Sequence, residues 1–222
     1  MGRGLNHRQT WLWGLALAVV VLLCGVCFVY VDKPVAIWMH GQRHTLLRRL
    51  FNVVTNLGES QWYLVPGLVL FIAYRKSRAF VAQAGLFVFT TVAASGLLTD
   101  LVKYVLGRAR PSLWFEHGFY GFHWFHGAHA WSSFPSGHAT TAYSAALALA
   151  LLFPRHRWTC LVAAAAIAIS RVVLTHHYVG DILAGAYVGA LSTMWLYGRV
   201  FRERLAAARS VRLDSKRRVI QS

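Results

Sequence analysis

The chain has 222 residues, of which 57% are hydrophobic and 14% charged, and its 23 Lys and Arg against 7 Asp and Glu give a formal net charge of +16. Soluble globular proteins average about 45–50% apolar and about 25% charged residues, so this composition excludes an ordinary soluble domain and a disordered chain. A nucleic-acid-binding protein gathers its basic residues on one water-facing surface. Here they form short clusters between apolar runs, so we expect an integral membrane protein and no nucleic-acid partner.

Six apolar stretches are expected to form transmembrane helices, because a helix crosses the bilayer core in about 20 residues. In chain order they are residues 11–31, 61–74, 79–101, 137–153, 158–174 and 179–197. The first resembles a signal peptide, but it is long, lacks a small-residue cleavage site and is followed by similar segments, so we expect it to be retained. The second is short, so its helix is expected to begin near Gly58 or to be tilted. Three cysteines, Cys24, Cys27 and Cys160, lie in these stretches and are expected to pack as small hydrophobic residues, without a disulfide framework.

The basic residues predict the orientation, because cytoplasmic segments of membrane proteins carry an excess of Lys and Arg. With the N-terminus inside, most of the basic residues fall on the inner side, including Arg3, the segments 75–78 and 155–157, and the tail. We therefore expect an all-α integral membrane fold with six transmembrane helices and both termini cytoplasmic. We also expect a single domain over residues 1–222, with a motif core at 100–185 and a basic cytoplasmic tail at 199–222 that anchors to anionic lipid.

The segment 33–50 mixes basic and apolar residues, including Lys33, Arg43, Arg48 and Arg49. Two interpretations are equally compatible with this pattern. It is either an amphipathic helix in the outer membrane interface or a solvated loop.

The outer ends of the last four helices carry most of the unusual polar residues. The sequence reads DLVKYVLGRARP over residues 100–111, PSGH over 135–138 and SRVVLTHHYVGD over 170–181. Charged and polar groups are costly in a bilayer and need partners there. We therefore expect these three segments to meet in one site at the outer face.

Three basic residues in these segments predict an anion site: Lys103, Arg110 and Arg171. Arginine binds phosphate oxygens in a bidentate manner. The backbone N–H groups of Ser136 and Gly137 begin a helix, and a helix N-terminus also favours an anion. The expected ligand is a phosphate group.

A nucleophile is predicted beside this anion site. His177 and Asp181 are four residues apart, so on a helix the carboxylate can hold one imidazole nitrogen while the other faces the substrate. His177 would then act as the nucleophile and His138 as the general acid that protonates the leaving oxygen. We favour His177 over its neighbour His176, because only His177 has the carboxylate at this spacing.

Together, K-x6-RP, PSGH and SR-x5-H-x3-D resemble the three signature motifs of the type 2 phosphatidic acid phosphatase family, which also contains glucose-6-phosphatase and the vanadium haloperoxidases. The match runs from Lys103 to Asp181 without a departure at a motif position. The resemblance implies a six-helix membrane phosphatase that uses no metal or other cofactor and works through a phosphohistidine on His177. His138 would serve as acid and then base, and Asp181 would orient His177.

The resemblance also implies hydrolysis of a lipid phosphate monoester or pyrophosphate in a bacterial inner membrane, with the active site facing the periplasm. Candidate substrates are undecaprenyl pyrophosphate, phosphatidylglycerol phosphate, phosphatidic acid and the phosphates of lipid A. The compact chain favours the undecaprenyl pyrophosphate and phospholipid type, followed by a lipid A phosphatase. Alternatives are a phosphotransferase that passes the phosphate to a lipid hydroxyl and a non-catalytic lipid-binding or transport protein. No obligate protein partner is expected.

The roles of several other residues near the motifs have two possible interpretations. Arg108 either steers anionic headgroups or is a solvated or lipid-facing charge, and Asp100 is expected to pair with Lys103 or Arg108. The loop 112–134 contains four histidines that could suggest a metal, although their irregular spacing favours an interfacial belt. We expect five of its aromatic residues to form a lid or headgroup-facing wall: Trp114, Phe115, Trp124, Phe125 and Trp131.

Overall fold

The computed structural model describes residues 7–42 and 44–210, so Arg3, Arg43 and residues 211–222 of the basic tail lie outside the described residues. The described part is helical and contains no β-strand, which confirms the all-α prediction. Its elements are α1 (His7–Val26), η1 (Cys27–Val31), α2 (Asp32–Gly41), α3 (Leu46–Val54), η2 (Thr55–Gly58), α4 (Gln61–Tyr74), α5 (Ala79–Leu106), α6 (Pro111–His117), η3 (His129–Trp131), α7 (Gly137–Leu152), η4 (Pro154–His156), α8 (Arg157–Val173), α9 (Val179–Leu196) and η5 (Tyr197–Phe201).

Each of the six predicted stretches forms a helix, but the helices differ in length. Within the described residues, four continuous helical segments are long and apolar enough to cross a membrane: Trp11–Gly41, Ala79–Leu106, Pro154–Val173 and Val179–Ser210. The other two, α4 and α7, have 14 and 16 residues. At about 1.5 Å per residue they are shorter than a hydrocarbon core of about 30 Å. The chain is thus a multi-pass membrane protein, while six crossings remain a prediction.

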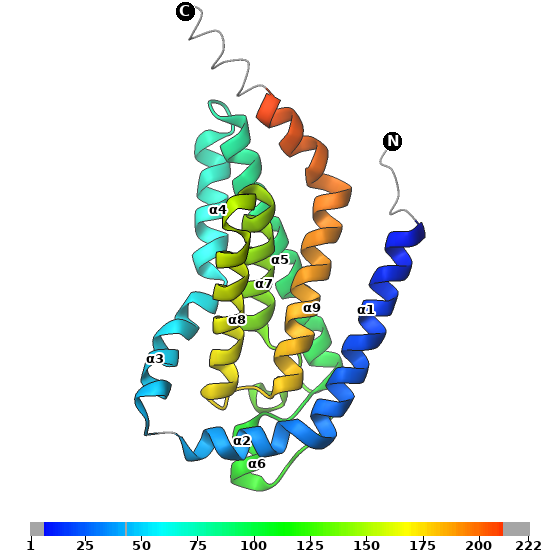
Figure 1. The fold of residues 1–222 in the computed structure, drawn as a ribbon, viewed down its shortest axis with the longest axis vertical. Coiled ribbons are helices and arrows are strands. Elements are labelled where there is room, and N and C mark those ends of the chain that lie inside the picture. The colour runs from blue at the N-terminus through cyan, green and yellow to red at the C-terminus, as the bar shows by residue number, and fades with distance from the viewer. Residues whose placement is uncertain (1–6, 43, 211–222) are drawn as a thin grey trace, which may run out of the picture.

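The long helices run alongside one another, and the described ends of α1 and of the helix that continues α9 lie at the same end of the molecule (Figure 1). The opposite end holds α2, α3, α6 and the turn between α8 and α9. Helix α7 packs against α5, α8 and α9, while α4 packs on α5 and α1 on α9. All three motif segments lie at the end opposite the described termini.

Two glycines bring α9 directly against α7. A Cβ atom at Gly185 would lie 2.5 Å from the carbonyl oxygen of Ser136, and one at Gly189 would lie 2.5 Å from that of Thr140. Small residues allow membrane helices to approach this closely. The PSGH segment at the start of α7 is therefore held against the first turns of α9, where the third motif ends.

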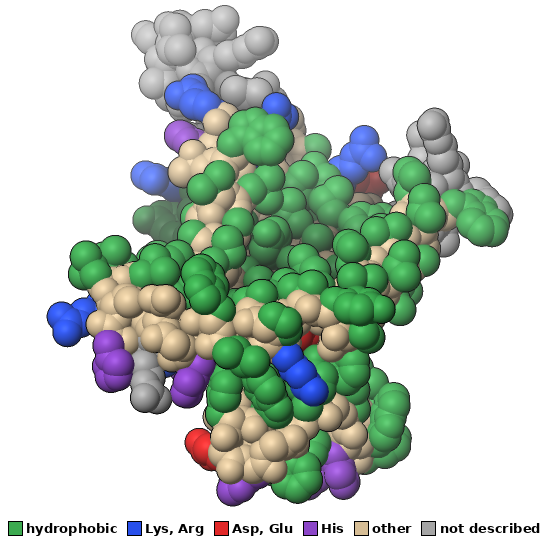
Figure 2. Space-filling view, turned by 60° about the horizontal axis from the view of Figure 1, so that its bottom comes forward, with side chains coloured by type: hydrophobic (Ala, Val, Ile, Leu, Met, Phe, Trp, Pro, Cys, Tyr) green, Lys and Arg blue, Asp and Glu red, His purple; other side chains and the backbone are tan. Residues whose placement is uncertain are grey.

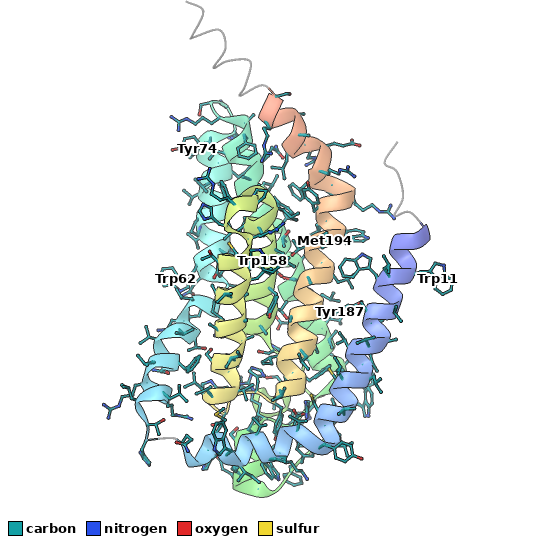
Figure 3. The ribbon with its side chains drawn as sticks, in the orientation of Figure 1. Trp11, Trp62, Tyr74, Trp158, Tyr187 and Met194 are labelled. Atoms are coloured by element: carbon teal, nitrogen blue, oxygen red, sulfur yellow. The ribbon has the colours of Figure 1, made fainter. Side chains whose placement is uncertain are left out.

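The outer surface of the helices is apolar, as expected for contact with lipid. Trp11 and Trp62 are 71% and 58% exposed, and both point away from the bundle (Figure 3). Tyr187 on α9 instead faces α1, and its hydroxyl donates to the carbonyl of Trp13 at 3.0 Å. Helix α1 thus packs against the bundle through α9 while most of its other side chains remain exposed.

The segment 33–50 is largely helical, which agrees with the first of its two interpretations. Helix α2 crosses the end of the bundle, and α3 continues beside α8 (Figure 1). In α3, Leu46, Leu50 and Val53 are all exposed. Its position in a membrane interface remains a prediction.

Candidate active site

Three segments of the chain that are distant in sequence meet at one end of the helix bundle. Gly107 ends α5 with a left-handed φ of +56°, and a Cβ there would collide with the carbonyl of His123. The chain then passes Ser133, whose backbone N–H donates to the carbonyl of Arg108 at 3.0 Å. The N–H of Ser136 donates to the carbonyl of Asp181 at 3.0 Å. Backbone hydrogen bonds therefore join the first motif segment to the residues just before PSGH, and PSGH to the third motif segment.

His177 lies in the turn between α8 and α9 and is 3% exposed. Its Nδ1 is 2.8 Å from the backbone carbonyl of Ser133. A carbonyl only accepts hydrogen bonds, so Nδ1 carries the proton and Nε2 keeps its lone pair in the neutral ring. This is the tautomer that attack by Nε2 requires.

Asp181 lies near His177 but makes its shortest hydrogen bonds elsewhere. Its Oδ2 is 3.6 Å from His177 Nδ1, whereas it accepts from Ser133 Oγ at 2.6 Å and from the N–H of Tyr178 at 2.8 Å. The second oxygen, Oδ1, is 2.6 Å from Arg108 Nη1. The carboxylate and the Ser133 carbonyl therefore hold His177 from the same side, and the carbonyl is the closer group.

Arg108 is buried, with 1% of its surface exposed. The two predictions for this residue, a charge that steers anionic headgroups and a solvated or lipid-facing charge, are therefore both wrong. Its Nη1 binds Asp181, and its Nη2 lies 2.6 Å from Oδ2 of Asp32. The guanidinium also lies over the ring of Tyr178, at 4.5 Å from the centroid. A buried charge needs such partners because the interior solvates it poorly. Arg108 supports Asp181 instead of facing lipid headgroups or solvent.

The environment keeps these groups in defined charge states. Burial lowers the pKa of His177 to about 4, although the nearby carboxylate of Asp181 acts in the opposite direction. Burial also disfavours the charge of Arg108, but Asp181 and Asp32 outweigh it and raise the pKa of the guanidinium above its ordinary value. At neutral pH the site therefore contains a neutral imidazole at His177 beside the charged guanidinium of Arg108, which is paired with Asp181 and Asp32.

Two of the predicted anion ligands lie within electrostatic range of His177, and several carry donors that have no partner among the described residues. Arg110 and Arg171 both act electrostatically on His177. Arg110 donates to Ser132 Oγ at 3.3 Å and Arg171 donates to Thr55 Oγ1 at 2.6 Å. The Nε of each arginine is nevertheless buried without an acceptor in the described part of the chain. The buried hydroxyl of Ser136 also has no partner in residues 7–42 and 44–210. Buried donors are nearly always satisfied, so unpartnered donors from three motifs indicate the place of an anion.

Lys103 and Gly137 complete this group. Lys103 Nζ is 3.3 Å from Asp100 Oδ1, which confirms one of the two pairings predicted for Asp100. The same Nζ lies 3.2 Å from the position that a Cβ would take at Gly137. The lysine therefore reaches the first turn of α7, where backbone N–H groups are available to an anion.

His138 follows in the same turn and lies within electrostatic range of Arg171, His177 and Lys103. Gly58, at the end of η2, supports its ring, because a Cβ at Gly58 would lie 2.8 Å from His138 Cδ2. His138 also borders a cavity of about 350 Å³ between α4, α5 and α7. The predicted acid and nucleophile are thus both at the site.

His176 differs from its neighbour His177, because the side chain of His176 is exposed while that of His177 is buried.

The five aromatic residues of the predicted lid divide into separate groups. Trp131 packs against His123 and His126, with ring centroids 5.3 and 5.6 Å away. Phe115 stacks on His40 of α2 at 4.1 Å, whereas Trp124 and Phe125 are 60% and 66% exposed. Figure 2 shows hydrophobic side chains over much of this end of the molecule, with histidines at its edges. A lid function remains a prediction.

In the ranges 7–42 and 44–210, no three His, Cys, Asp or Glu side chains are close enough together to hold a metal ion. The four histidines of the loop thus do not form a ligand set with one another or with a carboxylate. Independence from metals remains a prediction that requires an assay.

Three partners in the site were not predicted: Asp32, Thr55 and Ser133. Asp32 is a lone carboxylate at the end of an apolar run, and a charge in such a place signals a buried partner. Thr55 gave no comparable signal. Ser133 acts on His177 through its backbone carbonyl, which every residue possesses, so no residue type could reveal it.

Residues 84–205 match the PAP2 superfamily. The chain is 33% identical over 202 residues to a lipid A 1-phosphatase of Rhizobium etli, covering 84% of this chain and 86% of the relative. It is 36% identical over 190 residues to a lipid A 1-phosphatase of Rhizobium johnstonii, covering 80% and 77%. The crystal structure of a PAP2-type phosphatidylglycerolphosphate phosphatase from Bacillus subtilis superposes with a TM-score of 0.58 at 20% identity, covering 84% of this chain and 94% of that one.

Proposed function

The chain belongs to the PAP2 superfamily and is a membrane lipid phosphatase, and we propose that it hydrolyses a phosphate monoester of lipid A. The observation that carries the phosphate site is the set of donors on Arg110, Arg171 and Ser136 that have no partner among the described residues, in the site that also contains the buried His177. The names of the two Rhizobium relatives favour lipid A over undecaprenyl pyrophosphate, which the compact chain alone had favoured.

The proposed reaction has two steps at phosphorus. Nε2 of His177 attacks the phosphate, the P–N bond forms and the P–O bond to the lipid breaks. In the same step the protonated imidazolium ring of His138 gives one proton to the leaving oxygen and becomes neutral. A water molecule then gives a proton to His138 and attacks the phosphohistidine, which releases inorganic phosphate and restores His177. Phosphoryl transfer needs little more than positioning and charge stabilisation.

The remaining site residues have supporting roles in this proposal. Lys103, Arg110, Arg171, Ser136 and the first N–H groups of α7 at Gly137 stabilise the charge on the transferring phosphoryl group. The Ser133 carbonyl fixes the tautomer of His177. Asp181 stabilises the positive charge that His177 carries as a phosphohistidine.

We also propose six crossings with the active site at the periplasmic face of a bacterial inner membrane. The site lies at the end opposite the described ends of α1 and the helix continuing α9 (Figure 1). The basic segments 75–78 and 155–157 lie at the ends of helices facing away from the site, which suits a cytoplasmic location. Helix α7 can be short because α5, α8 and α9 cover much of it.

Phosphate release from the purified protein tests the function. The panel contains lipid A, undecaprenyl pyrophosphate, phosphatidylglycerol phosphate and phosphatidic acid, each with and without EDTA. We expect the highest kcat/KM on lipid A, no release by His177→Ala and retained release by His176→Ala. Transfer of the phosphate to a second lipid without release of inorganic phosphate would instead identify a phosphotransferase.

A further inference from the structure

We propose that the cavity beside His138 is a subsite for the leaving group of the substrate and that it selects an uncharged, hydroxyl-rich group such as a sugar ring. The inference rests on the proposed function, because it concerns the part of the substrate that remains attached to the leaving oxygen. It goes further by assigning residues outside the three motifs to substrate selection.

The cavity has about 350 Å³ of space, which falls within the range of about 300–1,000 Å³ for small-molecule sites. It lies where the beginning of α4 meets α5 and the first turns of α7. Its walls contain the first residues of α7, including His138, but neither His177 nor Arg171. The cavity therefore adjoins the predicted acid and not the predicted nucleophile.

This position matches the leaving group. In phosphoryl transfer the attacking and leaving atoms lie roughly in line on opposite sides of phosphorus. If His177 attacks phosphorus from one side and His138 protonates the leaving oxygen on the other, the rest of the leaving group must lie beside His138. The cavity is the space that borders His138, so it can hold this part of the substrate.

The lining of the cavity indicates the chemistry of that group. Glu59 and Asp100 supply two carboxylates, and the walls contain no Lys or Arg. Each carboxylate is held through one oxygen: Glu59 Oε2 accepts from Gln61 Nε2 at 2.7 Å, and Asp100 Oδ1 pairs with Lys103 at 3.3 Å. The other oxygen of each can accept from a hydroxyl. Among the described residues Glu59 has no ion-pair partner, whereas Asp100 is paired with Lys103. The free oxygens of these two carboxylates accept from hydroxyl groups, and the unpaired charge of Glu59 disfavours a second phosphate.

The apolar part of the same lipid also has room at this position. Gly96 on α5 lines the cavity, and a Cβ there would meet no atom of another described segment within 4 Å. Leu97 and Leu101 on the same helix are 74% and 59% exposed. Acyl chains can therefore lie along α5 while the ring of the headgroup occupies the cavity. The phosphates of lipid A are attached to sugar rings, whereas the leaving group of undecaprenyl pyrophosphate is itself a phosphate.

The test compares phosphate release from lipid A with release from hexadecyl phosphate, whose leaving group has no hydroxyl. Glu59→Gln is expected to raise KM for lipid A by about tenfold, the effect of one lost hydrogen bond to a charged acceptor, while hexadecyl phosphate stays within about twofold. Glu116→Gln makes the same change on an exposed carboxylate of α6 outside the cavity and should alter neither substrate.

A second pair of variants tests the space itself. Gly96→Leu fills the cavity and should lower kcat/KM for lipid A more than for hexadecyl phosphate. Gly14→Leu makes the same change at another open position, on α1, and should change neither. If Glu59→Gln and Gly96→Leu each change kcat/KM equally for lipid A and hexadecyl phosphate, the subsite is wrong. The same holds if neither variant changes kcat/KM for either substrate. Both results would leave the proposed function intact. A wild-type enzyme that hydrolyses hexadecyl phosphate but not lipid A would contradict both the subsite and the proposed function.

Discussion

Arg108 and Asp32 form a buried ion pair across 76 residues of sequence, with Nη2 of the arginine 2.6 Å from Oδ2 of the aspartate. The other oxygen of Asp32 accepts from the N–H of Gly180 at 3.0 Å, beside Asp181. The residue that begins α2 is thus bound both to the α5–α6 connection and to the first turn of α9. The first membrane segment is therefore a structural part of the active site.

Asp32→Asn is expected to destabilise the protein by about 1.5–3 kcal/mol, the effect of one lost hydrogen bond between charged groups, because Arg108 keeps Asp181 as its second carboxylate partner. Phosphate release should fall as well. Without Asp32, Arg108 is held only by Asp181, so the position of the Asp181 carboxylate beside His177 is expected to change. The measurements are the unfolding midpoint in detergent and kcat on lipid A. Glu203→Gln, on an exposed carboxylate, is the control and should change the free energy of unfolding by less than about 0.5 kcal/mol. An equally small effect of Asp32→Asn would contradict the role of the pair.

Ser133→Ala removes the hydroxyl that donates to Asp181 Oδ2 at 2.6 Å but keeps the carbonyl that accepts from His177 at 2.8 Å. We expect kcat to fall by about tenfold, the cost of one hydrogen bond to a charged group. Phosphohistidine formation on His177 should remain detectable, because its tautomer is unchanged. Ser133→Thr keeps a hydroxyl and should restore part of the rate. Complete loss of the phosphoenzyme in Ser133→Ala would show that the carbonyl does not hold His177 by itself.

The helices and the motif residues of the site could be predicted from sequence, because apolar runs and fixed motif spacings are local patterns. The position of Arg108 could not. The segment GRAR contains two arginines in an irregular stretch, so no helical period indicates which one faces inward, and the partner Asp32 lies far away in sequence. The Ser133 carbonyl was beyond prediction because its position depends on how the loop before α7 meets α9.

Gly58→Ala is expected to reduce activity by displacing His138. The added methyl would lie 2.8 Å from His138 Cδ2 and 2.7 Å from Ile167 Cγ2, closer than carbon atoms pack. A displaced acid impairs poor leaving groups most, so kcat on an alkyl phosphate should fall more than kcat on an aryl phosphate. Gly14→Ala adds a methyl in open space and serves as the control. Equal losses on both substrates would indicate a general disturbance of the site instead of a misplaced acid.

Acid should destabilise the protein through His177. Burial lowers the pKa of His177 from 6.5 to about 4 in the folded chain. As the pH falls below 6.5, the unfolded chain binds a proton at this residue and the folded chain does not, so the free energy of unfolding decreases toward pH 4. From about pH 7 to about pH 5 this decrease amounts to about 2 kcal/mol. His177→Gln cannot take up the proton, so its unfolding midpoint in detergent should depend less on pH than that of the wild type. His156→Gln, on the exposed η4 turn, should follow the wild type. Parallel pH curves for the wild type and His177→Gln would show that His177 is not held neutral in the folded site.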